Sequence, residues 1–245
     1  MNDYIYGKNA VLEALSSENS RVNKVFIQKG IGLDTRLKKI IELCKDLSII
    51  FNFTDFKKYK EIFGDEVNLQ GVVASVSPVQ YKDFDEFLEE NPDRYRKIVI
   101  LDNITDPHNF GAIIRTLAAA GYDGVIIQNH RSVSVNATVE KISSGAVNKV
   151  PVIKVNSIVS CIQKLKNNNW WIIATDAEGD NNYLDIDYKN MNFAIVLGSE
   201  GDGISKPVLK LADYKVNLPT QFESLNVSCA CAVIVYETVR QISYT

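Results

Sequence analysis

The stretch that decides the fold is Ile98–Ile127, IVILDNITDPHNFGAIIRTLAAAGYDGVII. It opens on an apolar run, Ile98–Leu101, that is typical of a strand buried on both faces of a sheet. A polar turn, 102–109, follows, and the pattern then becomes helical up to Gly121, a residue type that commonly ends helices. A second apolar run, 125–127, completes a β-loop-α-β unit. Ligands of such units gather where the carboxyl end of the strand meets the start of the helix.

Two polar residues of this unit are candidates for a functional site. Asn109 ends the polar turn, where it either contacts a ligand or caps a helix that begins near Gly111. Arg115 lies about one and a half helical turns further on. We expect the side chains of Asn109 and Arg115 to reach toward a common side.

Composition limits the classes of protein that the chain can belong to. Its 245 residues, of which 46% are hydrophobic, suffice for one large domain or two small ones. No apolar run approaches the ~18–20 residues of a membrane span, and no signal peptide is evident, so a cytoplasmic protein is expected. The cysteines and histidines lack metal-ligand spacing, and we predict no metal. The net charge of −3 means that any RNA binding must come from local patches.

The chain divides near residues 78–96, an acidic segment with two prolines that is interpreted as a linker with a short helix at 84–90. Residues 1–77 are predicted to form a small α/β domain, and residues 97–245 a second, larger one. The expected elements of the first domain are helices at 4–15, 34–46 and 54–63 and strands at 24–28, 48–53 and 71–76. The second domain is expected to include a helix at 136–145 and to end in a long helix at 224–242.

A glycine-rich loop follows the apolar strand predicted at 193–197. Gly198 and Gly203 have the spacing of a phosphate-binding P-loop, but Ile204 stands where that loop has lysine. What remains is a flexible turn that lets the backbone approach a ligand closely, with Glu200 at its centre. A surface turn without a ligand is the alternative.

A third polar group lies at the start of the last helix. Ser224, Asn226 and Ser228 place two hydroxyls and an amide at a junction between loop and helix. Taken alone, capping of the helix by Ser224 or Asn226 explains such residues better than a ligand site does.

Together the three stretches resemble motifs 1, 2 and 3 of the SpoU (TrmH-type) RNA ribose methyltransferases. The residues that carry this resemblance are Asn109-x-Gly111-Ala112-x-x-Arg115-Thr116, Leu197-Gly198-Ser199-Glu200-Gly201-x-Gly203-Ile204-Ser205 and Ser224-Leu225-Asn226-Val227-Ser228. The first domain is similar to the substrate-binding domain of the RlmB branch, which methylates guanosine riboses of 23S rRNA. The residues that carry this similarity are Ile5-Tyr6-Gly7-x-Asn9-Ala10-Val11 and Gln70-Gly71-Val72-Val73-Ala74. The resemblance covers nearly the whole chain.

The resemblance implies an α/β protein with a small N-terminal ribosomal-protein-like RNA-binding domain. Its C-terminal SPOUT α/β domain would contain a deep trefoil knot that binds S-adenosylmethionine. The family also implies a homodimer, in which the last helix packs against its partner and completes the site. The residues expected to hold the adenosine part of the cofactor are Thr175, Leu197, Gly198, Gly201, Leu218 and Leu225.

The implied reaction is methylation of a ribose 2′-hydroxyl, with Arg115 as the principal catalytic residue. A guanidinium stays protonated, so we expect Arg115 to hold the target phosphate and stabilise the emerging alkoxide. The alternative is a general base after unusual activation. Asn109 would orient Arg115 or the ribose, and Glu200 would pair with Arg115 or fix its loop. Ser224 and Asn226 would hydrogen-bond the nucleotide.

Three functions remain open at this point. The extra N-terminal domain favours guanosine of 23S rRNA as the substrate, and a tRNA guanosine is the alternative. A non-catalytic RNA-binding protein of the same fold is a third possibility. One loop, residues 220–222, departs from the family pattern and puts the shape of one pocket wall in doubt.

Overall fold

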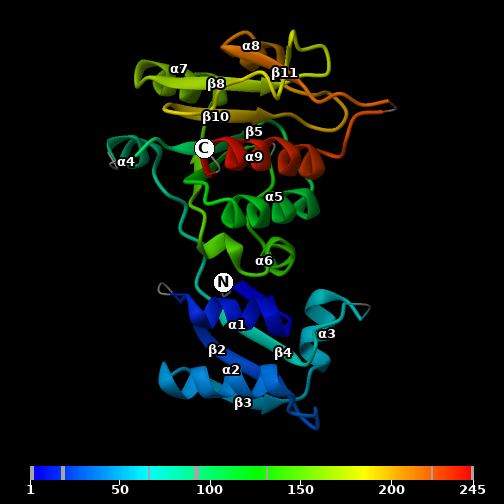
Figure 1. Cartoon of the computed structure of the whole chain (residues 1–245). Helices are drawn as coiled ribbons and strands as arrows, with labels where there is room; N and C mark the ends of the chain where they lie inside the picture. Colours follow the sequence, from blue (N-terminus) through cyan, green and yellow to red (C-terminus); the bar gives the residue numbers. More distant parts are fainter. Residues whose placement is uncertain are drawn as a thin grey trace. The chain divides into compact units, whose positions relative to one another are not determined.

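The computed structural model describes residues 3–17, 20–65, 67–90, 94–130, 132–221 and 223–243, so Phe222 of the divergent loop lies outside the described residues. The chain forms two compact units (Figure 1). The N-terminal unit comprises Met1–Gln80 and Val135–Lys149, and the C-terminal unit comprises Tyr81–Ser134 and Val150–Thr245. In the described part of the chain, no helix has both the length and the apolar character needed to cross a membrane.

The N-terminal unit is built on a four-stranded sheet in the order β1-β4-β2-β3, in which only β2 and β3 run parallel. Its strands are β1 (Asp3–Tyr6), β2 (Val22–Gln28), β3 (Ile50–Thr54) and β4 (Val72–Val76), and its first three helices are α1 (Lys8–Ser16), α2 (Thr35–Asp46) and α3 (Lys57–Phe63). Apolar residues of α1 and α2 share one core with the sheet, and α3 contributes Tyr59 to a second cluster. The helix predicted from residue 4 is wrong at its start, because residues 3–6 pair with β4 and Gly7 turns the chain at a φ of 92°.

Residues 135–149 pack on the N-terminal unit, although the sequence placed them in the second domain. This segment contains α6 (Ala137–Ser143) and the short 3-10 helix η1 (Ala146–Asn148). Asn136 caps α6 by accepting from the backbone N–H of Val139 at 3.0 Å, as its type suggested. Arg21 forms an ion pair with Glu140, whose side chain is almost fully buried, and Nε of Arg21 donates to Oδ1 of Asn148 at 3.3 Å. A pairing across more than a hundred residues leaves no local pattern in the sequence.

The C-terminal unit contains a seven-stranded sheet whose recorded strand pairs are all parallel, in the order β7-β6-β5-β10-β8-β11-β9. The strands are β5 (Lys97–Leu101), β6 (Gly124–Gln128), β7 (Val152–Val155), β8 (Trp170–Thr175), β9 (Asn181–Asn182), β10 (Asn192–Leu197) and β11 (Tyr214–Asn217). The helices are α4 (Phe84–Glu89), α5 (Pro107–Ala119), α7 (Ile158–Asn167), α8 (Lys206–Leu209) and α9 (Val227–Ser243). Parallel strands bring their carboxyl ends to one edge, where loops from distant parts of the chain meet.

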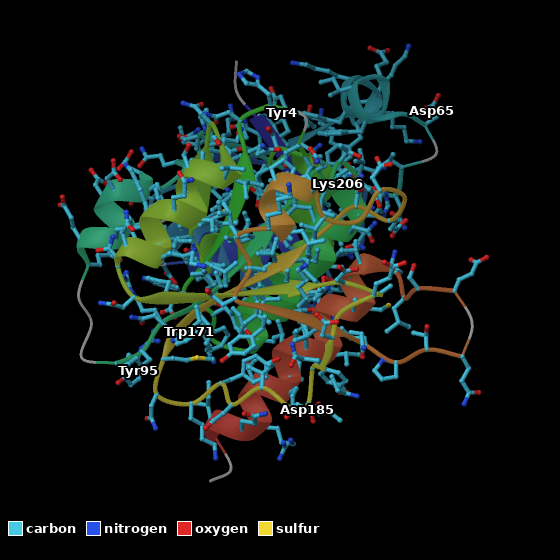
Figure 2. All side chains as sticks on the ribbon, turned by 90° about the horizontal axis from the view of Figure 1, so that it is seen from above. Tyr4, Asp65, Tyr95, Trp171, Asp185 and Lys206 are labelled. Atoms are coloured by element: carbon cyan, nitrogen blue, oxygen red, sulfur yellow. The ribbon has the colours of Figure 1, made fainter. Side chains whose placement is uncertain are left out.

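Helices cover both faces of this sheet. Buried residues of α4, α7 and α8 share a core with β5, β8 and β10, while α5 and α9 pack together on the opposite side (Figure 1). The short helix α8 begins at Lys206 (Figure 2). The helix predicted at 84–90 is confirmed as α4, but Phe84 and Phe87 are buried in the core. The segment from Tyr81 onward is therefore part of the second unit.

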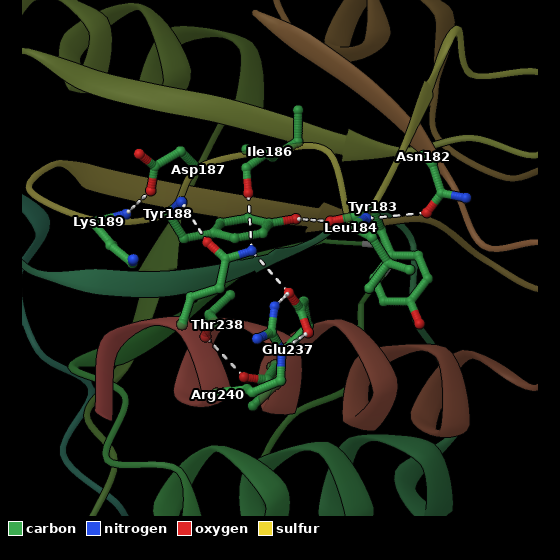
Figure 3. A network of polar contacts seen from close by, with 12 residues as sticks. Asn182, Tyr183, Leu184, Ile186, Asp187, Tyr188, Lys189, Glu237, Thr238 and Arg240 are labelled. Atoms are coloured by element: carbon green, nitrogen blue, oxygen red, sulfur yellow. Dashed lines mark hydrogen bonds and ion pairs between the residues drawn. The ribbon is translucent and has the colours of Figure 1, made fainter. Parts of the chain in front are cut away.

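The carboxyl-terminal part of α9 is held by buried polar contacts (Figure 3). Nε2 of Gln241 donates to the carbonyl of Ile186 at 3.0 Å and to Oε1 of Glu237 at 2.7 Å, while its Oε1 accepts from the backbone N–H of Tyr188 at 3.1 Å. The Arg240 guanidinium, 2.7 Å from Glu237, lowers the pKa of that carboxyl. These contacts fix α9 against the segment that precedes β10 and thereby fix the position of its first turn.

The strand order contains one crossing that matters for the predicted knot. β8 and β9 are consecutive along the chain, but β11 is hydrogen-bonded to both and lies between them. The connection between β8 and β9 passes so close to β11 that a Cβ on Gly179 would lie 2.8 Å from the carbonyl oxygen of Lys215. The later strand thus lies between two strands that precede it in the chain, an arrangement that strand lengths and periodicity do not reveal.

Candidate functional site

The loop between β5 and α5 begins the site. Asp106 caps α5, because its carboxylate oxygens accept from the backbone N–H groups of His108 at 3.0 Å and Asn109 at 3.2 Å. Pro107 occupies the first turn, where its missing N–H costs nothing. The interpretations of Asn109 as the cap and of Gly111 as the helix start are therefore wrong. Since Asp106 takes the capping role, the amide of Asn109 is available for other contacts.

Asn109, Glu200 and Asn226 form a hydrogen-bonded triad, each residue coming from a different motif. Nδ2 of Asn109 donates to Oε1 of Glu200 at 3.0 Å, and Nδ2 of Asn226 donates to Oδ1 of Asn109 at 3.0 Å. Asn226 also donates to the same carboxylate oxygen of Glu200. The structure thus joins the start of α5, the glycine loop and the start of α9 through side chains that lie 91 and 117 positions apart along the chain.

Asn226 also caps α9. Its Oδ1 accepts from the backbone N–H of Ser228 at 2.9 Å and from the Ser228 hydroxyl at 2.6 Å. The helix begins at Val227, three residues later than the sequence indicated. The capping and site interpretations therefore apply together, because the oxygen of the amide caps the helix while the nitrogen joins the triad.

Arg115 and Ser224 stand apart from the triad. Arg115 is exposed on α5, about 9 Å along the helix axis from Asn109, given a rise of about 1.5 Å per residue. Within the described residues it forms no ion pair or hydrogen bond, and Glu200 bonds to the two amides instead. The predicted pairing of Glu200 with Arg115 is therefore not what this chain shows. Ser224 is likewise exposed.

The residues predicted to hold the cofactor follow three neighbouring strands, β10, β8 and β11. Thr175 ends β8, Leu197 ends β10 and Leu218 follows β11, so all three lie at the carboxyl edge of the sheet. Thr175 donates its hydroxyl to the carbonyl of Val196 at 3.1 Å, which ties two of these strand ends together. Leu225 lies further along, in the loop before α9, and 42% of its surface is exposed.

The glycine loop after β10 is tightly folded. Its ends pair through two backbone hydrogen bonds between Ser199 and Gly203, of 3.0 and 3.2 Å. A Cβ on Gly198 would lie 2.1 Å from the carbonyl carbon of Gly203, whereas one on Gly201 would meet nothing within 4 Å. Gly198 is therefore required by the fold of the loop, and Gly201 leaves open space at its tip.

Asp102 is a site residue that the sequence analysis did not single out. Only 2% of its surface is exposed, and its Oδ2 accepts from the backbone N–H of Ser205 at 2.8 Å. Its own N–H donates to the carbonyl of Leu197 at 2.9 Å. Asp102 therefore fixes the loop after β5 to both ends of the glycine loop. An acidic residue directly after a buried strand was the feature that could have indicated it.

With this geometry in place, comparison with known proteins decides the family. Residues 96–236 match the model of the SpoU rRNA Methylase family, and residues 4–82 match the model described as RNA 2′-O ribose methyltransferase substrate binding. The chain belongs to the SpoU family. The relatives with similar sequences include a TrmH family tRNA/rRNA methyltransferase of Staphylococcus saprophyticus, 37% identical over 98% of this chain and 96% of that protein. The corresponding Staphylococcus epidermidis protein is 39% identical over 97% and 95% of the two chains.

Solved SpoU structures share the fold. The SpoU methyltransferase AviRb from Streptomyces viridochromogenes, solved in complex with its cofactor AdoMet, superposes with a TM-score of 0.80 at 22% identity over 98% of this chain and 90% of AviRb. The A. aeolicus TrmH/SpoU tRNA modifying enzyme matches with a TM-score of 0.55 at 31% identity, over 64% of this chain and 80% of that one. The predicted α/β fold with an N-terminal domain and a C-terminal SpoU methyltransferase domain is confirmed, as is the class of enzyme, an RNA methyltransferase. The RlmB branch stays a prediction.

Proposed function

We propose that this SpoU protein transfers a methyl group from S-adenosylmethionine to the ribose 2′-hydroxyl of a guanosine in 23S rRNA. The observation that carries the proposal is the triad of Asn109, Glu200 and Asn226. It joins all three SpoU motifs beside the strand ends that would hold the methyl donor. A protein that kept only the shell of the fold would have no need of these three polar side chains in contact.

The carboxyl ends of β8, β10 and β11 suit the adenosine part of the donor. We assign this role to Thr175, Leu197, Gly198, Gly201, Leu218 and Leu225. Gly198 fits because the backbone there leaves no room for a side chain, and Gly201 fits because the tip of its loop is open. Leu225 offers exposed apolar surface for a base. When bound, S-adenosylmethionine supplies a methyl group that is already electrophilic, so the protein has to orient the ribose hydroxyl and assist loss of its proton.

Arg115 is assigned to the RNA side of the reaction. Arg115 is exposed and forms no hydrogen bond or ion pair with the described residues, so its donors are available to a phosphate. Bidentate binding of the target phosphate would hold the ribose in place, and the positive charge would stabilise the oxygen as it becomes negative. Deprotonation of the guanidinium itself would be needed for a general base, which makes that role less favourable. Asn109 and Asn226 orient the nucleotide, Glu200 fixes both amides, and Ser224 donates to the nucleotide.

The RNA assignment rests on the arrangement of domains. The N-terminal unit matches a substrate-binding model, and the A. aeolicus enzyme described as tRNA modifying matches only 64% of this chain. An additional RNA-binding unit is useful for a large folded substrate, so we favour rRNA. The relatives' shared description, tRNA/rRNA methyltransferase, keeps a tRNA guanosine as the second candidate.

A homodimer in the cytoplasm completes the proposal. Along α9, Val233, Tyr236 and Ile242 expose 39%, 50% and 46% of their surfaces, so this helix presents apolar surface away from the core. A second copy of this chain would cover that surface. The position of β11 between β8 and β9, which both precede it in the chain, supports the predicted trefoil knot.

Two measurements test the function. Calorimetric titration of the purified protein with S-adenosylmethionine should show binding, and no binding would refute the enzyme in favour of a non-catalytic RNA-binding protein. Mapping of ribose 2′-O-methyl groups in cells with and without the gene should reveal one 23S rRNA guanosine that loses its methyl group. A lost methyl group in tRNA with an unchanged rRNA pattern would instead establish the second candidate.

A further inference from the structure

A polar concavity of about 330 Å³ lies in the C-terminal unit, at the carboxyl ends of β5, β6 and β7 and beside the first turns of α7 and α8. Its lining includes none of the six residues assigned to the cofactor. Its lining includes Asp102, Asn103, Gln128, His130, Ile158 and Val208. Its volume is at the lower end of the ~300–1,000 Å³ that small-molecule sites occupy, which is ample for a single nucleotide base.

The position of the concavity in the sheet favours a ligand. In the sheet, β5 lies between β6 and β10. The chain continues from β5 to β6 and β7 on one side and then crosses to the other side of β5 for β8 and β10, so the strand order reverses beside β5. Open parallel sheets bind ligands at the carboxyl ends of strands next to such a reversal. The buried Asp102, which accepts from Ser205 at 2.8 Å, ties this wall to the glycine loop. The concavity and the proposed reaction site therefore share the loop after β5, which leads to Asn109 on α5, and the glycine loop, which carries Glu200.

The polar side chains around the concavity have unused hydrogen-bonding groups. Neither Gln128, half-buried at the end of β6, nor Asn103 uses its side-chain amide in a hydrogen bond to another described residue. His130 forms none with them either. Ile158 and Val208 are buried and supply apolar surface. Convergent polar groups beside buried apolar side chains are typical of a site that orients a ligand.

The charges of the lining indicate the chemistry of that ligand. Among the described residues, which leave out position 131 beside His130, the lining contains one carboxylate, that of Asp102, and no lysine or arginine. A phosphate would find no lysine or arginine among these described residues and would meet the carboxylate. A nucleobase is neutral and planar, and its edge offers both donors and acceptors, which side-chain amides match.

We propose that this concavity receives an unpaired base of the RNA, either the base of the methylated nucleotide or that of its neighbour. The inference rests on the proposed function, because it assumes that RNA is the substrate. Gln128 is then a residue that binds the base and sets sequence preference, and Asn103 assists it. Unpaired bases that can be turned outward are what proteins recognise in RNA by sequence.

Substitution of Gln128 by leucine tests the proposal, because leucine keeps the apolar bulk and removes both hydrogen-bonding groups. Gln163→Leu, on the exposed face of α7, is the matched control. The unmodified protein is first titrated with each of the four nucleoside monophosphates while the side-chain amide of Gln128 is observed by NMR. The kinetics of both variants are then measured with RNA from cells that lack the gene.

We expect at least one nucleotide to shift the Gln128 amide. Gln128→Leu should raise KM for RNA about fivefold to tenfold, while leaving the affinity for S-adenosylmethionine and kcat within about twofold. Gln163→Leu should behave as the unmodified protein. A change of preference at the methylated position identifies that base as the occupant, and a change at the next position identifies the neighbour.

The inference is overturned if none of the four nucleotides shifts the Gln128 amide, or if KM for RNA is unchanged in Gln128→Leu. In either case, methyl transfer by the unmodified protein would leave the proposed function intact. If the unmodified protein methylates no RNA, the proposed function fails by that result, and the nucleotide titration alone decides whether the concavity binds a base.

Discussion

The triad can be tested by substituting Asn226 with aspartate. The new carboxylate retains the oxygen that caps α9 at Ser228, but it loses the amide hydrogens given to Asn109 and Glu200. It also places a second negative charge beside Glu200. Each of the two lost hydrogen bonds and the new like-charge contact should cost roughly 0.5–1 kcal/mol in water. Together they should lower the free energy of unfolding by about 2 kcal/mol. For a chain of this size, Tm should fall by about 4–8 °C.

Adding Glu200→Gln to Asn226→Asp should restore stability, because the glutamine amide can donate to the aspartate while its oxygen still accepts from Asn109. Thermal unfolding followed by circular dichroism measures all three proteins under one condition. Asn226→Ala serves as a comparison and should lose about as much stability as the aspartate variant, since it removes the cap, worth about 1 kcal/mol, but adds no like charge beside Glu200. If Asn226→Asp leaves Tm unchanged, or if the second substitution brings no recovery, the triad is not formed as described.

Two other predictions concern the glycine loop and the last helix. Gly198→Ala should lower both Tm and the affinity for S-adenosylmethionine, because its Cβ would lie 2.1 Å from the Gly203 backbone. Gly201→Ala is the control and should leave Tm unchanged, because its Cβ would meet nothing within 4 Å. Equal effects of the two substitutions on Tm would refute the close packing of the loop. The pKa of Glu237 is lowered, chiefly by its hydrogen bonds with Arg240. The ionised carboxylate therefore stabilises the folded state above its ordinary pKa of 4.5, and this stabilisation is lost as pH falls through the lower pKa of the folded state. Urea unfolding between pH 3 and 6 should therefore show a shallower loss of stability at low pH in Glu237→Gln, and parallel curves for the two proteins would contradict this.

Much of the second unit could be predicted from local patterns. The apolar runs at 98–101 and 193–197 are strands β5 and β10, and the polar turns that follow them meet at the sheet edge because the strands are parallel neighbours. Their adjacency explains why Asn109 and Glu200 come into contact although the sequence separates them widely. Asp106 rather than Asn109 caps α5, and this difference matters because the capping role decides whether the Asn109 amide can join the triad.

Long-range contacts were not predictable from periodicity. Residues 135–149 follow β6 in the chain yet pack on the N-terminal unit through Arg21 and Glu140, and a single ion pair carries no repeat in the sequence. β9 has only two residues, too few for a period of two to be recognised, and its pairing with β11 joins segments that are far apart in the sequence. Asp102 was missed for a similar reason, since its partner Ser205 lies 103 positions away.

We assign Arg115 to the RNA side of the methyl transfer. The most direct test of this assignment is the transfer of labelled methyl from S-adenosylmethionine to RNA by Arg115→Ala, with the affinity for S-adenosylmethionine measured on the same preparation. The account predicts a loss of at least about 10²-fold in the rate of transfer, the size expected when one group that stabilises an oxyanion is removed. The affinity for the methyl donor should stay within about twofold, because Arg115 lies outside the strand ends assigned to it. Substantial residual transfer by Arg115→Ala would contradict the assignment.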